Sequence, residues 1–262
     1  LIFKNIGEFY LNTENKICFQ AYNTKNFSYN FFGLEDFRRL PINEIDLNNA
    51  LNEKEVSTIR SAFDNTLNDK NKLSHIEFGL LEYDERFITL LDNNPVIKRI
   101  EAILGHCIQL HSATARVTKP NAPNQNWHRD GPWPVDPEGT PFGSIPGQVN
   151  CGYYLDELTE EIGPIAVVPG SHKALFKPPS QDIDFPDQKL ILAKPGQAII
   201  FNGWLYHRGL GNKSNSKRRV CLICYQNSWM KSRETFDGPV SSKLKNNGTD
   251  LQKLLLGEVD KW

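Results

Sequence analysis

The sequence predicts a mainly β fold with flanking helices, in which a double-stranded β-helix, or jelly roll, forms the core. Two observations predict this architecture. After Gly105 the chain consists of short β-like runs separated by Gly, Pro, Asn and Asp, without alternating helices, as in antiparallel sandwiches and barrels. Before Gly105 the apolar residues follow helical spacing, and helices packed outside a double-sheet jelly roll fit this order.

Three helices are predicted by apolar residues at helical spacing, over 52–65, 84–92 and 95–104. Asn52 can cap the first of them, and Glu55 three residues later completes a capping-box pattern. Apolar segments near Ile17 to Tyr22 could form strands. Five further strands are predicted between turn formers: Cys107–Lys119, Gln148–Leu155, Ile165–Val168, Gln197–Phe201 and Arg219–Gln226.

We expect all 262 residues to form a single domain, because this length is common for sandwiches and barrels. Its parts would be a helix-rich segment over about 1–105, the jelly-roll core over 106–227 and a C-terminal tail over 228–262. The tail is polar, and a short helix is expected there around Asp250 to Leu256.

The composition argues against nucleic-acid and membrane partners. A formal net charge of -1 and 23% charged residues give no electrostatic reason to expect a nucleic-acid or membrane partner, and the run Lys217-Arg218-Arg219 is too short to change this. No apolar run could span a bilayer, and Leu1-Ile2-Phe3-Lys4 lacks the features of a signal peptide, so the cytoplasm is the expected compartment.

The five cysteines are an odd number and widely scattered, which argues against a disulfide framework. Cys221 and Cys224 form a C-x-x-C pair, but no second pair or histidine at zinc spacing accompanies it. Both are therefore expected to be buried thiols.

His128 and Asp130 form a candidate metal-binding pair. Residues two apart on an extended segment share a face, and an imidazole with a carboxylate makes two thirds of the facial triad that binds non-haem Fe(II). The pair alone also occurs by chance. His207 follows the predicted strand 197–201 and could complete the triad, because a jelly roll brings remote strands face to face at its mouth.

Arg218 enters a predicted strand eleven residues after His207. Its planar guanidinium could bind a carboxylate bidentately, as an Fe(II) enzyme with a dicarboxylate co-substrate requires. The neighbouring Arg219 would point to the opposite face of the strand, so only one of the two can serve this role.

Five segments of the chain occur in the order and spacing of a known family. They are Gln-Asn-Trp-His-Arg-Asp (125–130), Tyr-Leu-Asp-Glu-Leu-Thr-Glu-Glu-Ile-Gly-Pro (154–164), Val-Pro-Gly-Ser-His (168–172), Pro195-Gly196 before the strand leading to His207, and Asn-Lys-Ser (212–214) with Arg218. The stretch from Gln109 to Tyr225 thus resembles the phytanoyl-CoA dioxygenase-like Fe(II)/2-oxoglutarate oxygenases, whose core is a cupin-like jelly roll.

The resemblance implies that His128, Asp130 and His207 are iron ligands and that Arg218 holds the distal carboxylate of 2-oxoglutarate. Gln125 matches a glutamine that contacts the chelating end of 2-oxoglutarate in some members, although Asn126 is adjacent. The implied cofactor and co-substrates are Fe(II), 2-oxoglutarate and O2. Related halogenases have a small residue in place of the carboxylate ligand, so Asp130 implies hydroxylation or another oxidative reaction such as desaturation.

Two positions depart from the family pattern. Ile162 replaces the Asn of the common motif Glu-Asn-Gly-Pro. Arg208 separates His207 from Gly209, where the family usually has His followed directly by Gly. Both departures leave the ligands intact. The Pro-Gly-Ser-His turn at 169–172 is interpreted as structural.

The loop 131–147, rich in Pro, Gly and aromatic residues, is interpreted as a lid or binding wall, with a rigid surface loop as the alternative. Candidate substrate-binding residues are Arg129, Trp133, Phe142 and Trp229. The expected substrate is a small-molecule metabolite of natural-product biosynthesis, of which an alkaloid toxin is one example. The alternatives are an acyl-CoA or amino-acid substrate and a non-catalytic jelly-roll protein that binds a metal or ligand. The oligomeric state is left open.

Overall fold

A computed structural model describes residues 50–67, 72–130, 147–174, 178 and 182–259, together with the backbone of three short N-terminal strands. These strands are β1 (Glu8–Leu11), β2 (Ile17–Gln20) and β3 (Ser28–Asn30), and they form an antiparallel sheet in that order. The second of them coincides with the apolar segment near Ile17 that was predicted to be able to form a strand.

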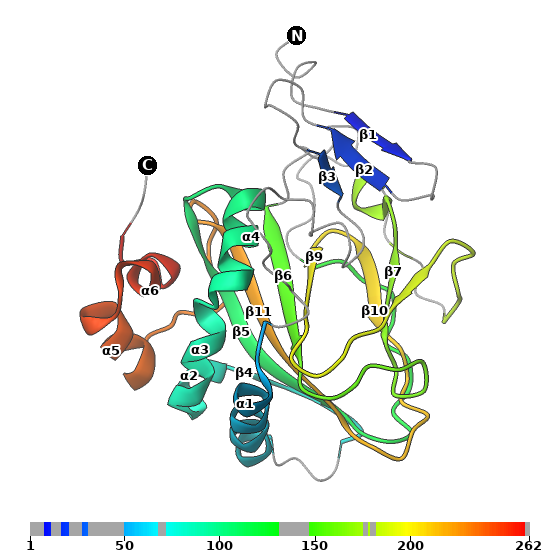
Figure 1. Cartoon of the computed structure of the whole chain (residues 1–262), viewed down its shortest axis with the longest axis horizontal. Helices are drawn as coiled ribbons and strands as arrows, with labels where there is room; N and C mark the ends of the chain where they lie inside the picture. The colour runs from blue at the N-terminus through cyan, green and yellow to red at the C-terminus, as the bar shows by residue number, and fades with distance from the viewer. Residues whose placement is uncertain are drawn as a thin grey trace.

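A five-stranded antiparallel sheet lies at the centre of the structure (Figure 1). Across the sheet, its strands are β4 (Ser74–Phe78), β5 (Ile108–Thr118), β11 (Arg218–Asn227), β6 (Gln148–Tyr154) and β9 (Ala198–Asn202). A smaller antiparallel sheet follows the order β10 (Tyr206–Gly209), β7 (Ile165–Val168) and β8 (Lys189–Ile191). The two sheets contain all five strands predicted after Gly105.

Helices cover one face of the five-stranded sheet (Figure 1). They are α1 (Glu53–Thr66), α2 (Leu80–Tyr83), α3 (Ile88–Leu91), α4 (Asn94–Leu104), α5 (Pro239–Asn247) and α6 (Asp250–Leu255), with short 3-10 turns at Glu85–Phe87 and Ser171–Lys173. The predicted capping box is present. The Asn52 side chain accepts from the Glu55 amide, and the Glu55 side chain accepts from the Asn52 amide. The antiparallel sheets with flanking helices confirm the predicted fold class at this level.

The two faces of the central sheet differ in chemistry because strand side chains alternate. Ala113, Ala115 and Val117 of β5 belong to the large apolar core shared with the helices. The hydroxyl groups of Tyr153 and Tyr225 donate to the carbonyls of Leu90 and Leu91, at 3.1 and 2.9 Å. The helices therefore take up the apolar face, and the opposite face is left for the smaller sheet and for polar residues.

A second apolar cluster lies between the two sheets and includes Ile165, Val167, Ile199 and Val220. The Pro-Gly-Ser-His turn ties β7 to β10, because the hydroxyl of Ser171 donates to the Val168 carbonyl at 2.6 Å and accepts from the Tyr206 amide at 2.7 Å. This contact gives the turn a structural role.

The predicted helix over 84–92 is divided in the structure. Asp84 has an extended backbone and accepts from the Arg86 amide at 2.9 Å, so a 3-10 turn begins there and α3 starts only at Ile88. After the N-terminal sheet, the strands β4, β8 and β10 and the helices α2 and α5 were not predicted. Each strand is five residues or shorter and depends on pairing with a strand remote in sequence.

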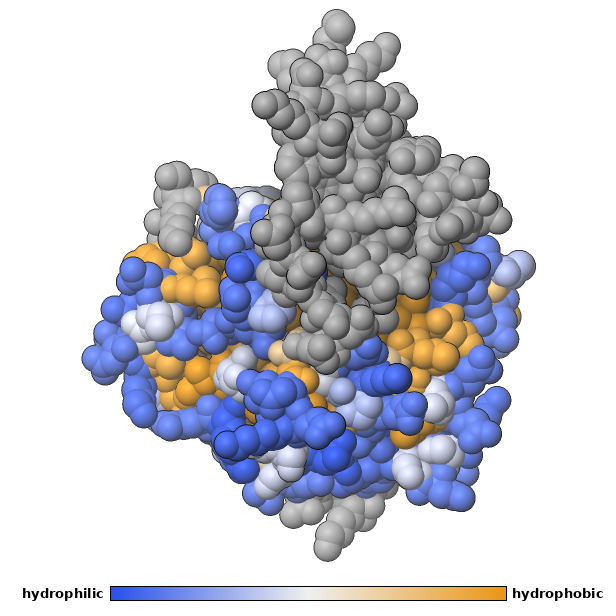
Figure 2. Space-filling view, in the orientation of Figure 1, coloured by the Kyte–Doolittle hydropathy of each residue, from blue (hydrophilic) through white to orange (hydrophobic). Residues whose placement is uncertain are grey.

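In the coloured part of Figure 2, hydrophilic side chains cover most of the displayed face, with smaller apolar areas between them. No helix in the described ranges is both long and apolar enough to cross a membrane.

One carboxylate binds the start of helix α5. Glu82 of α2 accepts hydrogen bonds from the backbone amides of Val240 and Ser241 at 2.8 and 3.0 Å and from the Ser241 hydroxyl, at the start of α5. We expect Glu82→Ala to lower the free energy of unfolding by about 1–3 kcal/mol, because these donors lose their acceptor. Urea unfolding measures this loss.

The matched control is Glu85→Ala, which removes only an exposed ion pair with Lys243 at 2.9 Å. It should change the free energy of unfolding by less than about 1 kcal/mol. Equal effects of the two substitutions would contradict this role of Glu82.

Candidate metal centre

His128 and His207 lie side by side because their backbones pair. Each amide donates to the other residue's carbonyl, at 3.1 and 3.0 Å, so the segment around His128 runs antiparallel to β10. The amide of Asp130 donates to the Gly203 carbonyl at 2.6 Å. One possible ligand atom from each of His128, Asp130 and His207 lies within 4.8 Å of the other two. The structure thus brings the three predicted ligands together.

Backbone carbonyls orient both imidazoles. Nδ1 of His128 lies 2.8 Å from the Asn126 carbonyl, and Nδ1 of His207 lies 2.9 Å from the Leu205 carbonyl. A carbonyl oxygen can only accept, so each Nδ1 carries a hydrogen, and Nε2 is the nitrogen of each ring that could bind a metal. Backbone contacts of this kind orient histidine ligands toward a metal.

Asp130 is held in its ionised form. Burial acts to raise its pKa, but the charge of His207 and the hydrogen bonds from His207 and Asn150 outweigh burial and lower the pKa below its usual range. Asp130 Oδ2 lies 3.3 Å from Nε2 of His207 and accepts from the Asn150 amide at 2.7 Å. Burial and the nearby His207 lower the pKa of His128 to about 4, so its imidazole is neutral at neutral pH.

A polar network that was not predicted supports Asp130. The Asn150 side-chain oxygen accepts from the Cys224 thiol at 2.6 Å, and the Gln148 amide donates to the Cys224 sulfur at 2.8 Å. All three side chains are buried, and burial raises the pKa of the Cys224 thiol well above its usual value. The sequence signal was the polar pair Gln148 and Asn150, two apart in an otherwise apolar strand.

The expectation that Cys221 and Cys224 are buried is confirmed.

Arg218 lies in the same cavity as the candidate ligands and is 5% exposed. Its guanidinium donates to the Thr118 hydroxyl at 2.9 Å, and it forms no ion pair with a carboxylate of the described residues. Arg219 points away, as predicted, and pairs with Asp156 at 3.0 Å. Gln125 also lines the cavity, and its oxygen accepts from the Gly209 amide at 2.8 Å.

The cavity is bounded by the polar face of the central sheet and by β10. Besides the residues named above, the lining includes Ile76, Phe78, His111, Ser112, Thr114, Arg116, Tyr154, Ile165, Phe201, Val220, Leu222, Ile223 and Arg233.

The two predicted substrate-binding residues that the structure describes, Arg129 and Trp229, do not line this cavity. Arg129 donates to the carbonyls of Ser171 and Ala174, and its guanidinium lies 4.6 Å from the ring centre of Tyr206. Trp229 is 67% exposed, and neither residue contributes to the described lining. Trp133 and Phe142, with most of the loop 131–147, lie outside the described residues.

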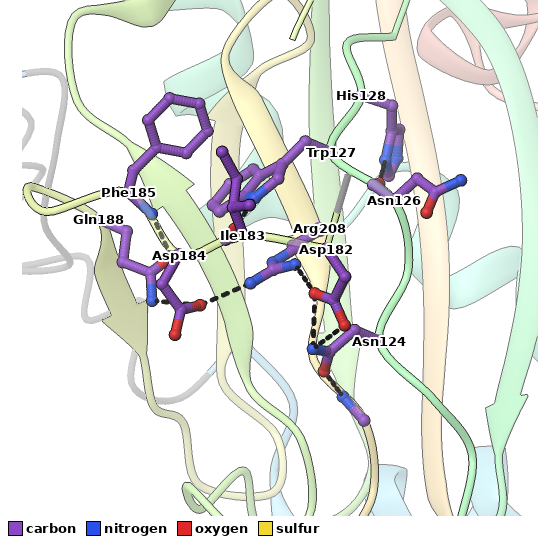
Figure 3. A network of polar contacts seen from close by, with 11 residues as sticks. Asn124, Asn126, Trp127, His128, Asp182, Ile183, Asp184, Phe185, Gln188 and Arg208 are labelled. Carbon is purple, nitrogen blue, oxygen red and sulfur yellow. Dashed lines mark hydrogen bonds and ion pairs between the residues drawn. The ribbon is translucent and has the colours of Figure 1, made fainter. Parts of the chain in front are cut away.

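Arg208, the residue inserted after His207, anchors the segment 182–185 beside Trp127 (Figure 3). Its buried guanidinium pairs with Asp182 and Asp184 at 2.5 and 2.6 Å and lies 4.6 Å from the ring centre of Trp127. The Trp127 indole donates to the Ile183 carbonyl at 2.7 Å. The residues adjacent to both histidines are thus fixed to one segment.

A sequence model of the phytanoyl-CoA dioxygenase family matches residues 42–220, which is more than half of the chain. The chain belongs to the phytanoyl-CoA dioxygenase family. This finding confirms the resemblance found in the sequence.

Two relatives of this family member are dioxygenases of Aspergillus. Dioxygenase hkm4 of Aspergillus hancockii is 36% identical over 108 residues, and dioxygenase trt7 of Aspergillus terreus is 32% identical over 120 residues. These matches cover 40% and 42% of the chain, but only 33% and 38% of the relatives' own length.

Among solved structures, HygX of Streptomyces hygroscopicus has a similar fold, with a TM-score of 0.60 and 16% identity over 71% of this chain and 83% of HygX. It has been crystallised with iron, with nickel and 2-oxoglutarate, and with nickel, 2-oxoglutarate and hygromycin B. The donors of this phytanoyl-CoA dioxygenase family member fit such an iron. They are two imidazole nitrogens and one carboxylate oxygen, all lining one cavity.

The hydrogen bond from Asn150 should matter for metal binding. We expect Asn150→Ala to raise the dissociation constant for Ni(II) by roughly 10- to 100-fold, because Asp130 loses the contact that orients it. Calorimetric titration of the full chain measures the constant.

Asn126→Ala is the matched control, because only the backbone carbonyl of Asn126 contacts His128 and its side chain is exposed. Its dissociation constant should equal that of the wild type. If both variants bind Ni(II) equally well, Asn150 does not orient the ligand.

The contacts of Arg208 generate a second prediction. The double variant Asp182→Asn, Asp184→Asn leaves the buried guanidinium without its two carboxylates. We expect the free energy of unfolding to fall by about 1–3 kcal/mol, less than for a fully buried pair because both aspartates are exposed.

Asp187→Asn serves as the control on the same segment, since Asp187 is exposed. Urea unfolding of both proteins would refute the role of Arg208 if the double variant were as stable as this control.

Proposed function

We propose that this protein is an Fe(II)- and 2-oxoglutarate-dependent dioxygenase that hydroxylates a C–H bond of a small-molecule metabolite. One observation carries the proposal. His128, Asp130 and His207 share a cavity with Arg218, whose buried guanidinium has no carboxylate partner among the described residues. An iron triad and a site for the distal carboxylate of 2-oxoglutarate would explain both features.

In this proposal His128, Asp130 and His207 hold Fe(II), and Arg218 neutralises the distal carboxylate of 2-oxoglutarate. When bound, iron and 2-oxoglutarate supply the oxidising chemistry, in which O2 is consumed and succinate and carbon dioxide are released. Gln125 uses its oxygen for the Gly209 amide, so its amide nitrogen is available to the co-substrate. Backbone carbonyls keep the two histidines oriented, and Asn150 keeps Asp130 oriented.

The proposed core is a jelly roll in which the five-stranded and three-stranded sheets face each other. The apolar cluster between the sheets and the similarity to HygX support it. Gly209 fits this arrangement, because an added Cβ would lie 2.5 Å from the Gln125 oxygen and 3.1 Å from the Arg218 guanidinium. A side chain at this position would obstruct the proposed co-substrate site.

The presence of hygromycin B in a HygX structure supports a small-molecule substrate. A role in natural-product biosynthesis and a cytoplasmic location are proposed from the sequence. Substrate-stimulated succinate release across a panel of metabolites, acyl-CoA thioesters and amino acids, with the mass of each product, distinguishes these substrate classes.

Anaerobic addition of Fe(II) and 2-oxoglutarate should produce a visible charge-transfer band that is absent in His128→Ala. We expect Arg218→Gln to raise the half-saturating 2-oxoglutarate concentration by roughly 10- to 100-fold, because a bidentate contact with the carboxylate is lost. Arg219→Gln is the matched control, since Arg219 pairs with Asp156 outside the cavity.

The absence of this band in folded, iron-loaded protein would overturn the proposal. A band without succinate release from any member of the panel would instead favour the non-catalytic binding protein.

A further inference from the structure

A second arginine, Arg116, faces the cavity. It lies on β5 opposite Val220 of β11, two residues from Thr118, which lies opposite Arg218. Alternate residues of a strand share a face, so Arg116, Thr118 and Arg218 all belong to the polar side of the sheet. Arg116 accordingly lines the same cavity as the three candidate ligands.

Among the described residues, no contact compensates the charge of Arg116. The one hydrogen bond found for the Arg116 guanidinium among the described residues goes to the Ser74 hydroxyl, at a long 3.3 Å. Its Nε is buried and lacks a hydrogen-bond partner there, and no described carboxylate forms an ion pair with it. Burial lowers the pKa of Arg116, which reflects the cost of keeping a charge in this place.

The proposed co-substrate does not require this residue. In the proposed function the keto-acid end of 2-oxoglutarate meets the metal and its distal carboxylate meets Arg218. Arg116 lies nearer than Arg218 to the metal end of the sheet, because the pairing proceeds from Arg218 to Val220 and then to Cys224, which contacts Asn150. It also lies beside Ile76 of β4, which adds an apolar wall.

The charge of the cavity points in the same direction. Its described lining contains three arginines, Arg116, Arg218 and Arg233, but Asp130 as its one acidic residue. The charges of Fe(II) and of the 2-oxoglutarate dianion would cancel. An excess of positive charge therefore remains for a further ligand.

We infer that the substrate carries an anionic group, a carboxylate, phosphate or sulfate, and that Arg116 is the residue that binds it. This inference rests on the proposed function. It identifies the substrate class and a residue that determines specificity, and it separates the roles of the two arginines: Arg218 binds the co-substrate and Arg116 the substrate.

The first test compares the two arginines through 2-oxoglutarate alone. In anaerobic titrations followed by the charge-transfer band, Arg218→Gln should raise the half-saturating concentration at least tenfold, and Arg116→Gln should change it less than threefold. A loss in Arg116→Gln as large as in Arg218→Gln would make Arg116 a co-substrate residue and overturn the inference. Absence of the band in the wild type would refute the proposed function itself.

The second test uses probes that differ in charge. Ligand-observed NMR with the full chain, loaded with Ni(II) and 2-oxoglutarate, would compare phenylacetate with phenylacetamide, octanoate with octanamide, and phenyl phosphate with phenol. At least one anion should bind at least tenfold more tightly than its neutral partner. This preference should be lost in Arg116→Gln and partly kept in Arg116→Lys.

Three results would overturn the inference: no binding of any anion to the wild type, equal binding of the charged and neutral partners, or an unchanged preference in Arg116→Gln. Thermal unfolding guards against a merely structural role. Because no described carboxylate loses a partner, Arg116→Gln should melt at or above the wild-type temperature. A lower melting temperature with unchanged anion binding would assign Arg116 to the fold and also contradict the inference.

Discussion

The backbone pairing between His128 and His207 is the contact on which the site depends. Two hydrogen bonds align segments that are remote in sequence, and each histidine then anchors its ring on a nearby carbonyl. Asp130 follows two residues after His128 and is fixed by its own backbone contact with Gly203. Because backbone bonds rather than long side chains set these positions, the three donor groups are oriented before any ligand arrives.

The alternation of side chains along the strands allows one sheet to serve two purposes. On β11, Cys221 faces the helices within the apolar core, whereas Arg218 and Cys224 face the cavity. The six described helices cover the apolar side, so the other side can carry charge and hydrogen-bonding groups without weakening that core. The polar network beneath Asp130 is built on this second face.

The arginines near the site fall into two groups. Arg208 and Arg219 each pair with carboxylates of the protein, and their charges are compensated within the fold. Arg218 and Arg116 face the cavity without such partners among the described residues. Since an uncompensated charge in a partly dry site is unfavourable, the second group indicates anionic ligands and the first indicates architecture.

The sequence by itself determined the strands of the core, the capped first helix and the separation of Arg218 from Arg219, because these follow from local periodicity and from side-chain alternation. It also singled out His128, Asp130 and His207, although their spacing alone could not bring them together. Tertiary structure decided the strands β4, β8 and β10, the support of Asp130 by Asn150 and the place of Arg116, because each depends on pairing between segments remote in the chain. Local patterns do not specify such partners. They therefore identified the candidate metal ligands but not the surroundings that orient them.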